Sequence, residues 1–135
     1  MLAERCVILI FLVCTVNSEI KDLLVETDIG FIKGLRADDG DYTMFLGLPF
    51  AEVNTSNPFG VATPHPGFEK TFEAYDDYAP CPQREEYNLT LVGSLNCLKL
   101  NIFVPDSASA KNRLPVLAYV FGGGFTDGIF RFSYK

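Results

Sequence analysis

The chain has 135 residues, of which 48% are hydrophobic and 13% aromatic, and its formal net charge is −6. At about 150 residues per domain, this length accommodates one domain at most, or a piece of one. The acidic balance argues against a nucleic-acid or anionic-membrane partner. The single histidine, His65, excludes from this chain any metal site that needs two imidazoles, and we expect neither a metal nor a cofactor.

Residues 1–18 have the three-part pattern of a secretory signal peptide. Arg5 precedes an unbroken apolar run from Cys6 to Val16, which is about half the ~20 residues needed to span a membrane. Val16 and Ser18, small or short residues at the −3 and −1 positions, favour cleavage before Glu19. We therefore predict a secreted, extracellular protein of residues 19–135 with no membrane contact after signal removal. The alternative is a buried strand or helix at the N-terminus.

Removal of the signal would leave two cysteines, Cys81 and Cys97, in an oxidising compartment. One disulfide between them is the economical interpretation, and two buried free thiols are the alternative. Two N-glycosylation sequons, which begin at Asn54 and Asn88, lie in polar, turn-rich stretches and agree with the same compartment.

Three β-rich runs open the mature chain, at 23–27, 29–36 and 42–50. Gly30, Gly34 and the cluster Asp38-Asp39-Gly40-Asp41 punctuate them, which predicts an antiparallel ribbon with a tight polar turn before the third run. The acidic cluster lacks the ligand spacing of an EF-hand, so we interpret it as a solvated turn and not as a calcium site.

Residues 52–82 show no regular pattern and hold five of the eight prolines, which excludes a core helix. We expect a long loop held in place by its aromatic side chains, which are Phe59, Phe68, Phe72 and Tyr75. Two further strands are predicted, at 98–104 and 115–121. The second is a continuous apolar run of the kind that is buried on both faces of a sheet, yet the sequence offers no amphipathic helix to cover it.

Three consecutive glycines, Gly122–Gly124, follow the last predicted strand, with Gly128 close behind. Each glycine costs about 0.5–1 kcal/mol of backbone entropy relative to alanine, so the chain needs a backbone without Cβ there. The spacing does not match that of phosphate- or dinucleotide-binding loops. It favours an oxyanion hole, in which bare N–H groups face a carbonyl oxygen that becomes negative. A plain glycine-rich turn is the alternative.

These stretches, in this order, resemble the N-terminal part of the type-B carboxylesterase and cholinesterase family, and most of all its insect secreted branch of antennal and juvenile-hormone-type esterases. The similar stretches are Gly30–Gly34, Tyr42–Ala51, Asn57–Gly60, Cys81–Gln83, Asn96–Pro105, Leu114–Val116 and Gly122–Phe125. Two departures stand out: Phe121 replaces the His or Tyr that often precedes the glycines, and Asn96 replaces an acidic residue, so the charge is lost.

The resemblance implies an α/β-hydrolase fold, here an incomplete one at residues 19–135 with an N-terminal antiparallel ribbon, the first strands of the central sheet and few helices. It also implies that Cys81 and Cys97 pair as the family's first disulfide. In the same way, Gly123 and Gly124 are implied as the backbone donors to the carbonyl of a small-molecule carboxylic ester.

Ester hydrolysis in this family needs a serine in a G-x-S-x-G elbow, an acid and a histidine. None of the six serines lies in such an elbow, and His65 lies upstream of the glycines between two prolines, where a loop-packing or exposed histidine is expected. We therefore expect a truncated N-terminal portion of a secreted carboxylic-ester hydrolase that is inactive alone. The alternative is a non-catalytic secreted binding or adhesion module, or a pseudogene product.

Overall fold

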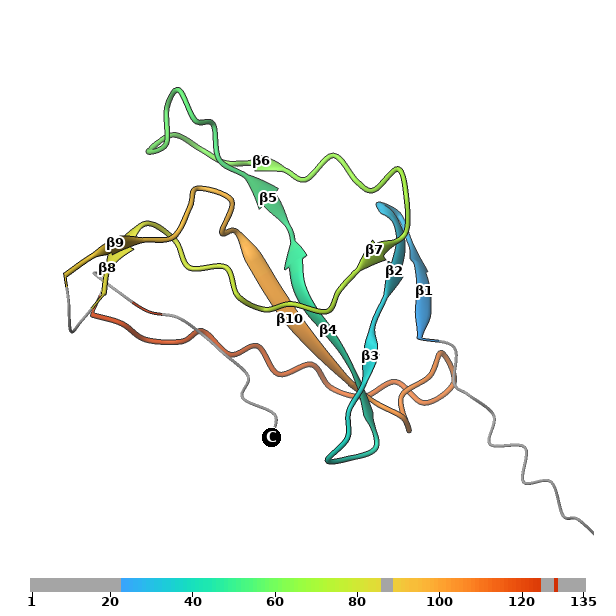
Figure 1. The fold of residues 1–135 in the computed structure, drawn as a ribbon. Coiled ribbons are helices and arrows are strands. Elements are labelled where there is room, and N and C mark those ends of the chain that lie inside the picture. Colours follow the sequence, from blue (N-terminus) through green and yellow to red (C-terminus); the bar gives the residue numbers. More distant parts are fainter. Residues whose placement is uncertain (1–22, 86–88, 125–127, 129–135) are drawn as a thin grey trace, which may run out of the picture.

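The computed structural model describes residues 23–85, 89–124 and 128, so the predicted signal peptide lies outside the described residues. Within this part of the chain there are strands and no helix. Four sheets form, with strand orders β1-β2-β7, β10-β4-β3, β5-β6 and β8-β9 (Figure 1). The strands are β1 (Leu24–Thr27), β2 (Gly30–Lys33), β3 (Leu35–Arg36), β4 (Tyr42–Pro49), β5 (Ala51–Glu52), β6 (Thr63–Pro64), β7 (Phe72–Glu73), β8 (Gln83–Arg84), β9 (Leu91–Val92) and β10 (Lys99–Pro105).

Strand β4 is the centre of the fold. It pairs antiparallel with β10 on one edge and with β3 on the other, and residues 43–49 are all buried. Its side chains contribute to two apolar clusters. One cluster contains Ile32, Phe45, Leu48 and Ala74, and the other contains Ala37, Met44 and Leu46. A strand that supplies both clusters must carry apolar side chains on both faces, as this one does from Met44 to Leu48, although Thr43 in the same strand is buried and polar.

A β-bulge interrupts the β4–β10 ladder at Gly47. The register shifts by one residue between Leu100 and Ile102, so two residues of β4 face Asn101 alone. Gly47 has a φ of +68°, a left-handed conformation that glycine adopts at little cost. Its N–H, which the ladder leaves unpaired, donates to Oδ1 of Asn101 at 2.8 Å.

The bulge is also where the chain after β7 packs against β4. The N–H of Leu46 donates to the carbonyl of Ala74 at 2.9 Å, and Leu46 forms a parallel bridge with Tyr75. A Cβ at Gly47 would run into the carbonyl oxygen of Asp76. The site therefore requires glycine for two reasons, the left-handed φ and the close approach of another backbone segment.

We expect Gly47→Ala to lower the free energy of unfolding by about 2–4 kcal/mol, because it adds both backbone strain and a clash with backbone. Urea denaturation followed by circular dichroism measures the change. Gly122→Ala is the matched control, since a Cβ at Gly122 would meet nothing within 4 Å. Equal stability of the two variants would contradict the role given to Gly47.

The predicted antiparallel ribbon is confirmed, but it divides between two sheets. Strands β1 and β2 pair antiparallel in one sheet, whereas β3 pairs antiparallel with β4 in another. The division falls at Gly34, which is buried, and a Cβ there would lie 2.6 Å from the carbonyl oxygen of Met44. The second predicted run, 29–36, is therefore two short strands separated by a close backbone approach, and not one continuous strand.

The acidic cluster forms the predicted exposed turn between β3 and β4. Tyr42 donates a hydrogen bond from its hydroxyl to Oδ1 of Asp39 at 2.6 Å. This bond raises the pKa of Tyr42 above its usual value of 10.0, and desolvation and the charge of Asp39 act in the same direction. Arg36 pairs with Asp106 and, at 3.3 Å, with Asp41, which ties the turn to the end of β10.

We expect Asp39→Ala to bring the pKa of Tyr42 down towards 10.0. Because the folded pKa is raised, the stabilisation from this bond is present below pH 10 and is lost as the pH rises through the folded pKa. Ultraviolet titration of the tyrosinate band measures the shift, with Tyr42→Phe to assign the signal and Asp38→Ala as the control. An unchanged titration in Asp39→Ala would exclude the bond.

The long loop at 52–82 is held by some of the aromatic residues that were expected to hold it. Phe68 and Phe72 stack at 4.6 Å and pack against the cluster of Ile32. Tyr75 lies at the bridge to β4. Phe59, in contrast, is 99% exposed, so the prediction was wrong for this residue. It lies in a turn of the segment between β5 and β6, which projects from the rest of the described fold (Figure 1).

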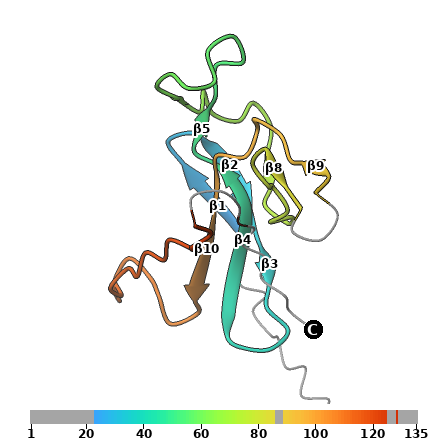
Figure 2. The same cartoon turned by 90° about the vertical axis from the view of Figure 1, so that its left-hand side faces the viewer.

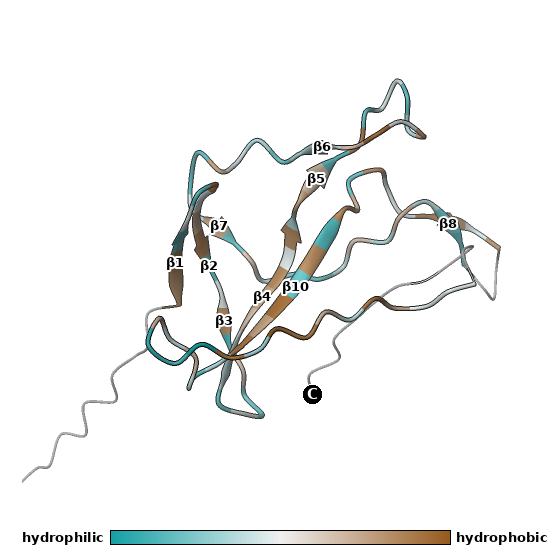
Figure 3. Ribbon diagram, turned by 180° about the vertical axis from the view of Figure 1, so that it is seen from behind, coloured by the Kyte–Doolittle hydropathy of each residue, from teal (hydrophilic) through white to brown (hydrophobic). Residues whose placement is uncertain are grey.

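The strand predicted at 98–104 is confirmed as β10, but the one predicted at 115–121 is wrong for the described structure. Residues 114–121 lie in no strand ladder, and Val116 is 95% and Val120 89% exposed. The chain after β10 loops out to one side of the β4–β10 pair (Figure 2). Much of the run is hydrophobic (Figure 3), yet it pairs with no strand in the described part of the chain, and Leu117 is 93% exposed as well.

Candidate functional site

The three glycines continue directly from the exposed apolar run. None of Gly122, Gly123 and Gly124 belongs to a described strand ladder. Gly124 has a φ of +59°, a conformation that non-glycine residues rarely adopt. Space is open beside Gly122, since a Cβ there would meet no atom within 4 Å. The backbone of this segment is thus left-handed at Gly124, and there is open space beside Gly122.

A cavity of about 280 Å³ borders the start of the glycine segment and lies between β10 and the apolar run. Its apolar lining comes mainly from these two sides, and the disulfide cysteines, Ala79 and Gly128 also line it, as do the polar side chains of Asp77, Lys99 and Asn101. A cavity that combines an apolar lining with a few polar groups suits a small ligand. The apolar lining side chains are Leu100, Phe103, Leu117, Tyr119 and Phe121.

Gln83 connects two walls of this cavity through its side-chain amide. Its Nε2 donates to the carbonyl of Gly128 at 3.1 Å and to that of Cys81 at 3.2 Å, and its Oε1 accepts from the N–H of Gly128 at 2.8 Å. From the sequence, Gln83 was only part of a similar stretch and had no assigned role. No local pattern could have linked it to a glycine 45 residues away.

Cys81 and Cys97 form the predicted disulfide, with their Cα atoms 5.0 Å apart. The segment around Cys81 also packs against the chain at Gly93. Gly93 has a φ of +91° and lies against the carbonyl oxygens of Pro80 and Cys81. The N–H of Ser94 donates to the carbonyl of Pro80 at 3.0 Å. The disulfide wall of the cavity therefore has backbone support that is independent of the S–S bond.

We expect the double variant Cys81→Ala/Cys97→Ala to lose about 3 kcal/mol of unfolding free energy, because the bond closes a loop of 16 residues in the unfolded chain. Urea denaturation with and without dithiothreitol measures the loss. Dithiothreitol should destabilise the wild-type chain to the same extent and leave the double variant unchanged. A wild-type chain that is insensitive to reductant would contradict this account.

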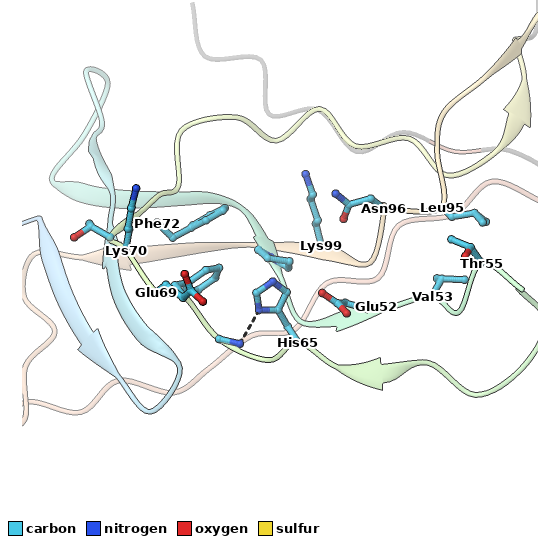
Figure 4. A pocket seen from close by; sticks show the side chains of 14 residues that line it. Glu52, Val53, Thr55, His65, Glu69, Lys70, Phe72, Leu95, Asn96 and Lys99 are labelled. Atoms are coloured by element: carbon cyan, nitrogen blue, oxygen red, sulfur yellow. Dashed lines mark hydrogen bonds between the residues drawn. The ribbon is translucent and has the colours of Figure 1, made fainter. Parts of the chain in front are cut away.

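His65 is a loop-packing histidine, as predicted. Its Nδ1 accepts a hydrogen bond from the N–H of Gly67 at 3.1 Å, and its ring lies 4.9 Å from that of Phe68. It lines a separate open cavity of about 680 Å³, together with side chains of both charges such as Glu52 and Lys99 (Figure 4). The lining of the cavity at Phe121 includes no histidine and no serine.

The remaining predicted sites are placed as follows. Asn54, the first sequon, is exposed, and its side chain accepts from the N–H of Ser56 in a turn. Asn88, the second, lies outside the described residues.

Among residues 23–85, 89–124 and 128, no group of three or more His, Cys, Asp or Glu side chains could hold a metal ion. Nor does any helix in this range have the length and apolarity needed to cross a membrane.

Comparison with known sequences identifies a matching family profile and several similar proteins. The profile described as the carboxylesterase family matches residues 21–131. An acetylcholinesterase from Danio rerio is 33% identical over 122 residues, which cover 79% of this chain and 19% of the relative. A bile salt-activated lipase from Homo sapiens is 33% identical over 111 residues, which cover 77% of this chain and 14% of the relative.

A solved structure gives the same result at the level of the fold. A PNB esterase is similar with a TM-score of 0.65 and 28% sequence identity, over 79% of this chain and 21% of that one. Such structural neighbours are α/β-hydrolase esterases. The chain thus spans between 14% and 21% of the length of these three relatives.

Proposed function

Because this chain belongs to the carboxylesterase family, we propose that it forms the N-terminal portion of a secreted carboxylic-ester hydrolase and supplies the oxyanion-hole donors through the N–H groups of Gly123 and Gly124. The observation that carries the proposal is the loop itself. Gly122–Gly124 lie in none of the described strands, with a left-handed Gly124, and follow directly from a segment that lines a cavity with both apolar and polar side chains.

The glycines stabilise negative charge through their N–H groups and form no covalent bond with the substrate. When a nucleophilic oxygen attacks the ester carbonyl, the carbonyl oxygen becomes negative in the tetrahedral intermediate, and each N–H aimed at it contributes about 3 kcal/mol of transition-state stabilisation. The alcohol then leaves after it takes a proton from the general acid. Water next hydrolyses the acyl-enzyme and releases the carboxylic acid of the ester. A backbone donor does not depend on neighbouring side chains, so Phe121 in place of His or Tyr is compatible with this role.

The nucleophile, acid and base belong, in this proposal, to a longer polypeptide. The chain corresponds to about a fifth of the acetylcholinesterase that it resembles, and no serine or histidine lines the cavity beside Phe121. Secretion and assignment to the insect secreted branch are part of the same proposal. The signal-like residues 1–18, the disulfide and the exposed Asn54 support secretion.

The proposal predicts that the purified 19–135 chain hydrolyses an activated p-nitrophenyl ester no faster than buffer and shows no acyl-enzyme burst. A coding sequence that extends past Lys135 should contain a G-x-S-x-G motif, and its product should show the burst. In that product, Gly123→Ala or Gly124→Ala keeps the N–H but adds a Cβ that should displace the donor, so kcat should fall by up to about 10²–10³-fold, the loss expected when one donor is removed. Gly60→Ala, at an exposed glycine in a distant turn, is the control.

Two results would count against this function. A stop codon directly after Lys135, together with a stable secreted chain, would favour the non-catalytic binding module. An extended product whose activity does not respond to Gly123→Ala or Gly124→Ala would remove these amides from the reaction.

A further inference from the structure

We propose that Gln83 is a positioning residue that fixes the geometry of the Gly122–Gly124 loop by clamping Gly128. The effect of this clamp on catalysis rests on the proposed function, but its hydrogen bonds do not. The side-chain amide of Gln83 uses both its donor and its acceptor on one residue, Gly128, at 3.1 Å and 2.8 Å. In this way it pairs with Gly128 as a neighbouring strand would.

Gln83 is itself well fixed. It is the first residue of β8, which pairs with β9 through Val92, and it lies two residues after Cys81 of the disulfide. Its Nε2 also donates to the carbonyl of Cys81 at 3.2 Å, which orients the amide. A side chain held by a strand pair, a disulfide and a local hydrogen bond can hold its partner in a defined position.

Gly128 in turn is packed against the beginning of the loop. Its φ is +151°, and a Cβ there would lie 2.8 Å from Cε2 of Phe121 and 3.1 Å from the carbonyl oxygen of Gly122. Phe121 and Gly122 therefore lie against Gly128. Through this contact, a restraint on Gly128 is also a restraint on the start of the glycine segment.

The clamp also satisfies backbone groups that nothing else is seen to satisfy. Gly128 lies outside the described strands, and both its N–H and its carbonyl are paired with Gln83. Loss of a partner leaves a part-buried donor or acceptor unpaired, and local opening then becomes more frequent. An oxyanion hole requires its donors to be fixed before the charge develops, so the clamp would act on the chemistry through the positions of the donors.

The test is amide hydrogen exchange on the full, oxidised chain labelled with ¹⁵N-glycine. Gln83→Met keeps the length of the side chain and removes all three hydrogen bonds, so the exchange of the Gly128 amide should accelerate about tenfold or more. Gln83→Glu keeps an acceptor for the Gly128 N–H but loses both donors to the carbonyls of Gly128 and Cys81, so it should accelerate the exchange of Gly128 less than Gln83→Met does. The amide shifts of Gly122–Gly124 should move in Gln83→Met.

Asn101→Leu is the reciprocal control, because the N–H of Gly47 depends on Asn101 in the same way, at 2.8 Å. It should accelerate the exchange of Gly47 and leave Gly128 unchanged, whereas Gln83→Met should do the reverse. If Gln83→Met also exposes Gly47, the variant has unfolded, and Gln83→Glu then decides: faster exchange at Gly128 with Gly47 still protected supports the clamp, and wild-type exchange at Gly128 overturns it.

Unchanged exchange at Gly128 in a folded Gln83→Met chain would overturn the proposal. So would loss of protection at Gly128 without movement of the Gly122–Gly124 shifts, because the clamp would then not reach the loop. Neither readout depends on hydrolysis, so failure of the clamp and failure of the proposed function are distinguishable.

Discussion

The hydrogen bond from the buried N–H of Gly47 to the side chain of Asn101 compensates for the ladder bond that the bulge removes from the central strand pair. The bulge leaves that N–H without a ladder partner, and a buried unpaired donor costs about 1–3 kcal/mol. Asn101 supplies the acceptor from the opposite strand. With the bulge satisfied, β4 can serve two apolar clusters, admit the Ala74–Asp76 backbone, and hold β10 in register beside the cavity.

The sequence predicted those parts of the fold that local composition decides. The strands at 24–27, 42–49 and 99–105 are β-rich runs bounded by turn residues, and they were found where expected. The bulge was not predictable, because Gly47 looks like an ordinary glycine within a strand and Asn101 like a polar residue on an exposed face. Their relation depends on a register that is set by contacts far apart in the chain.

The prediction of a buried strand at 115–121 failed for a different reason. Its composition indicated burial, but burial is a property of the surroundings, and within the described residues nothing covers Val116 or Val120. At the candidate site, the glycines were identifiable because a run of three has few uses. Gln83 was not, because a side-chain amide that pairs with a distant backbone leaves no mark on the local sequence.

The pairing of β4 with β10 also determines when this fold can form. Gly47 and Asn101 are 54 residues apart, so the contact order is high and ribosomal synthesis must pass β10 before the central ladder can close. The Cys81–Cys97 bond bypasses part of that interval, but closure entropy grows only with the logarithm of loop length, so the saving is about 0.3 kcal/mol. Oxidation therefore holds the finished fold together and does little to hasten its assembly.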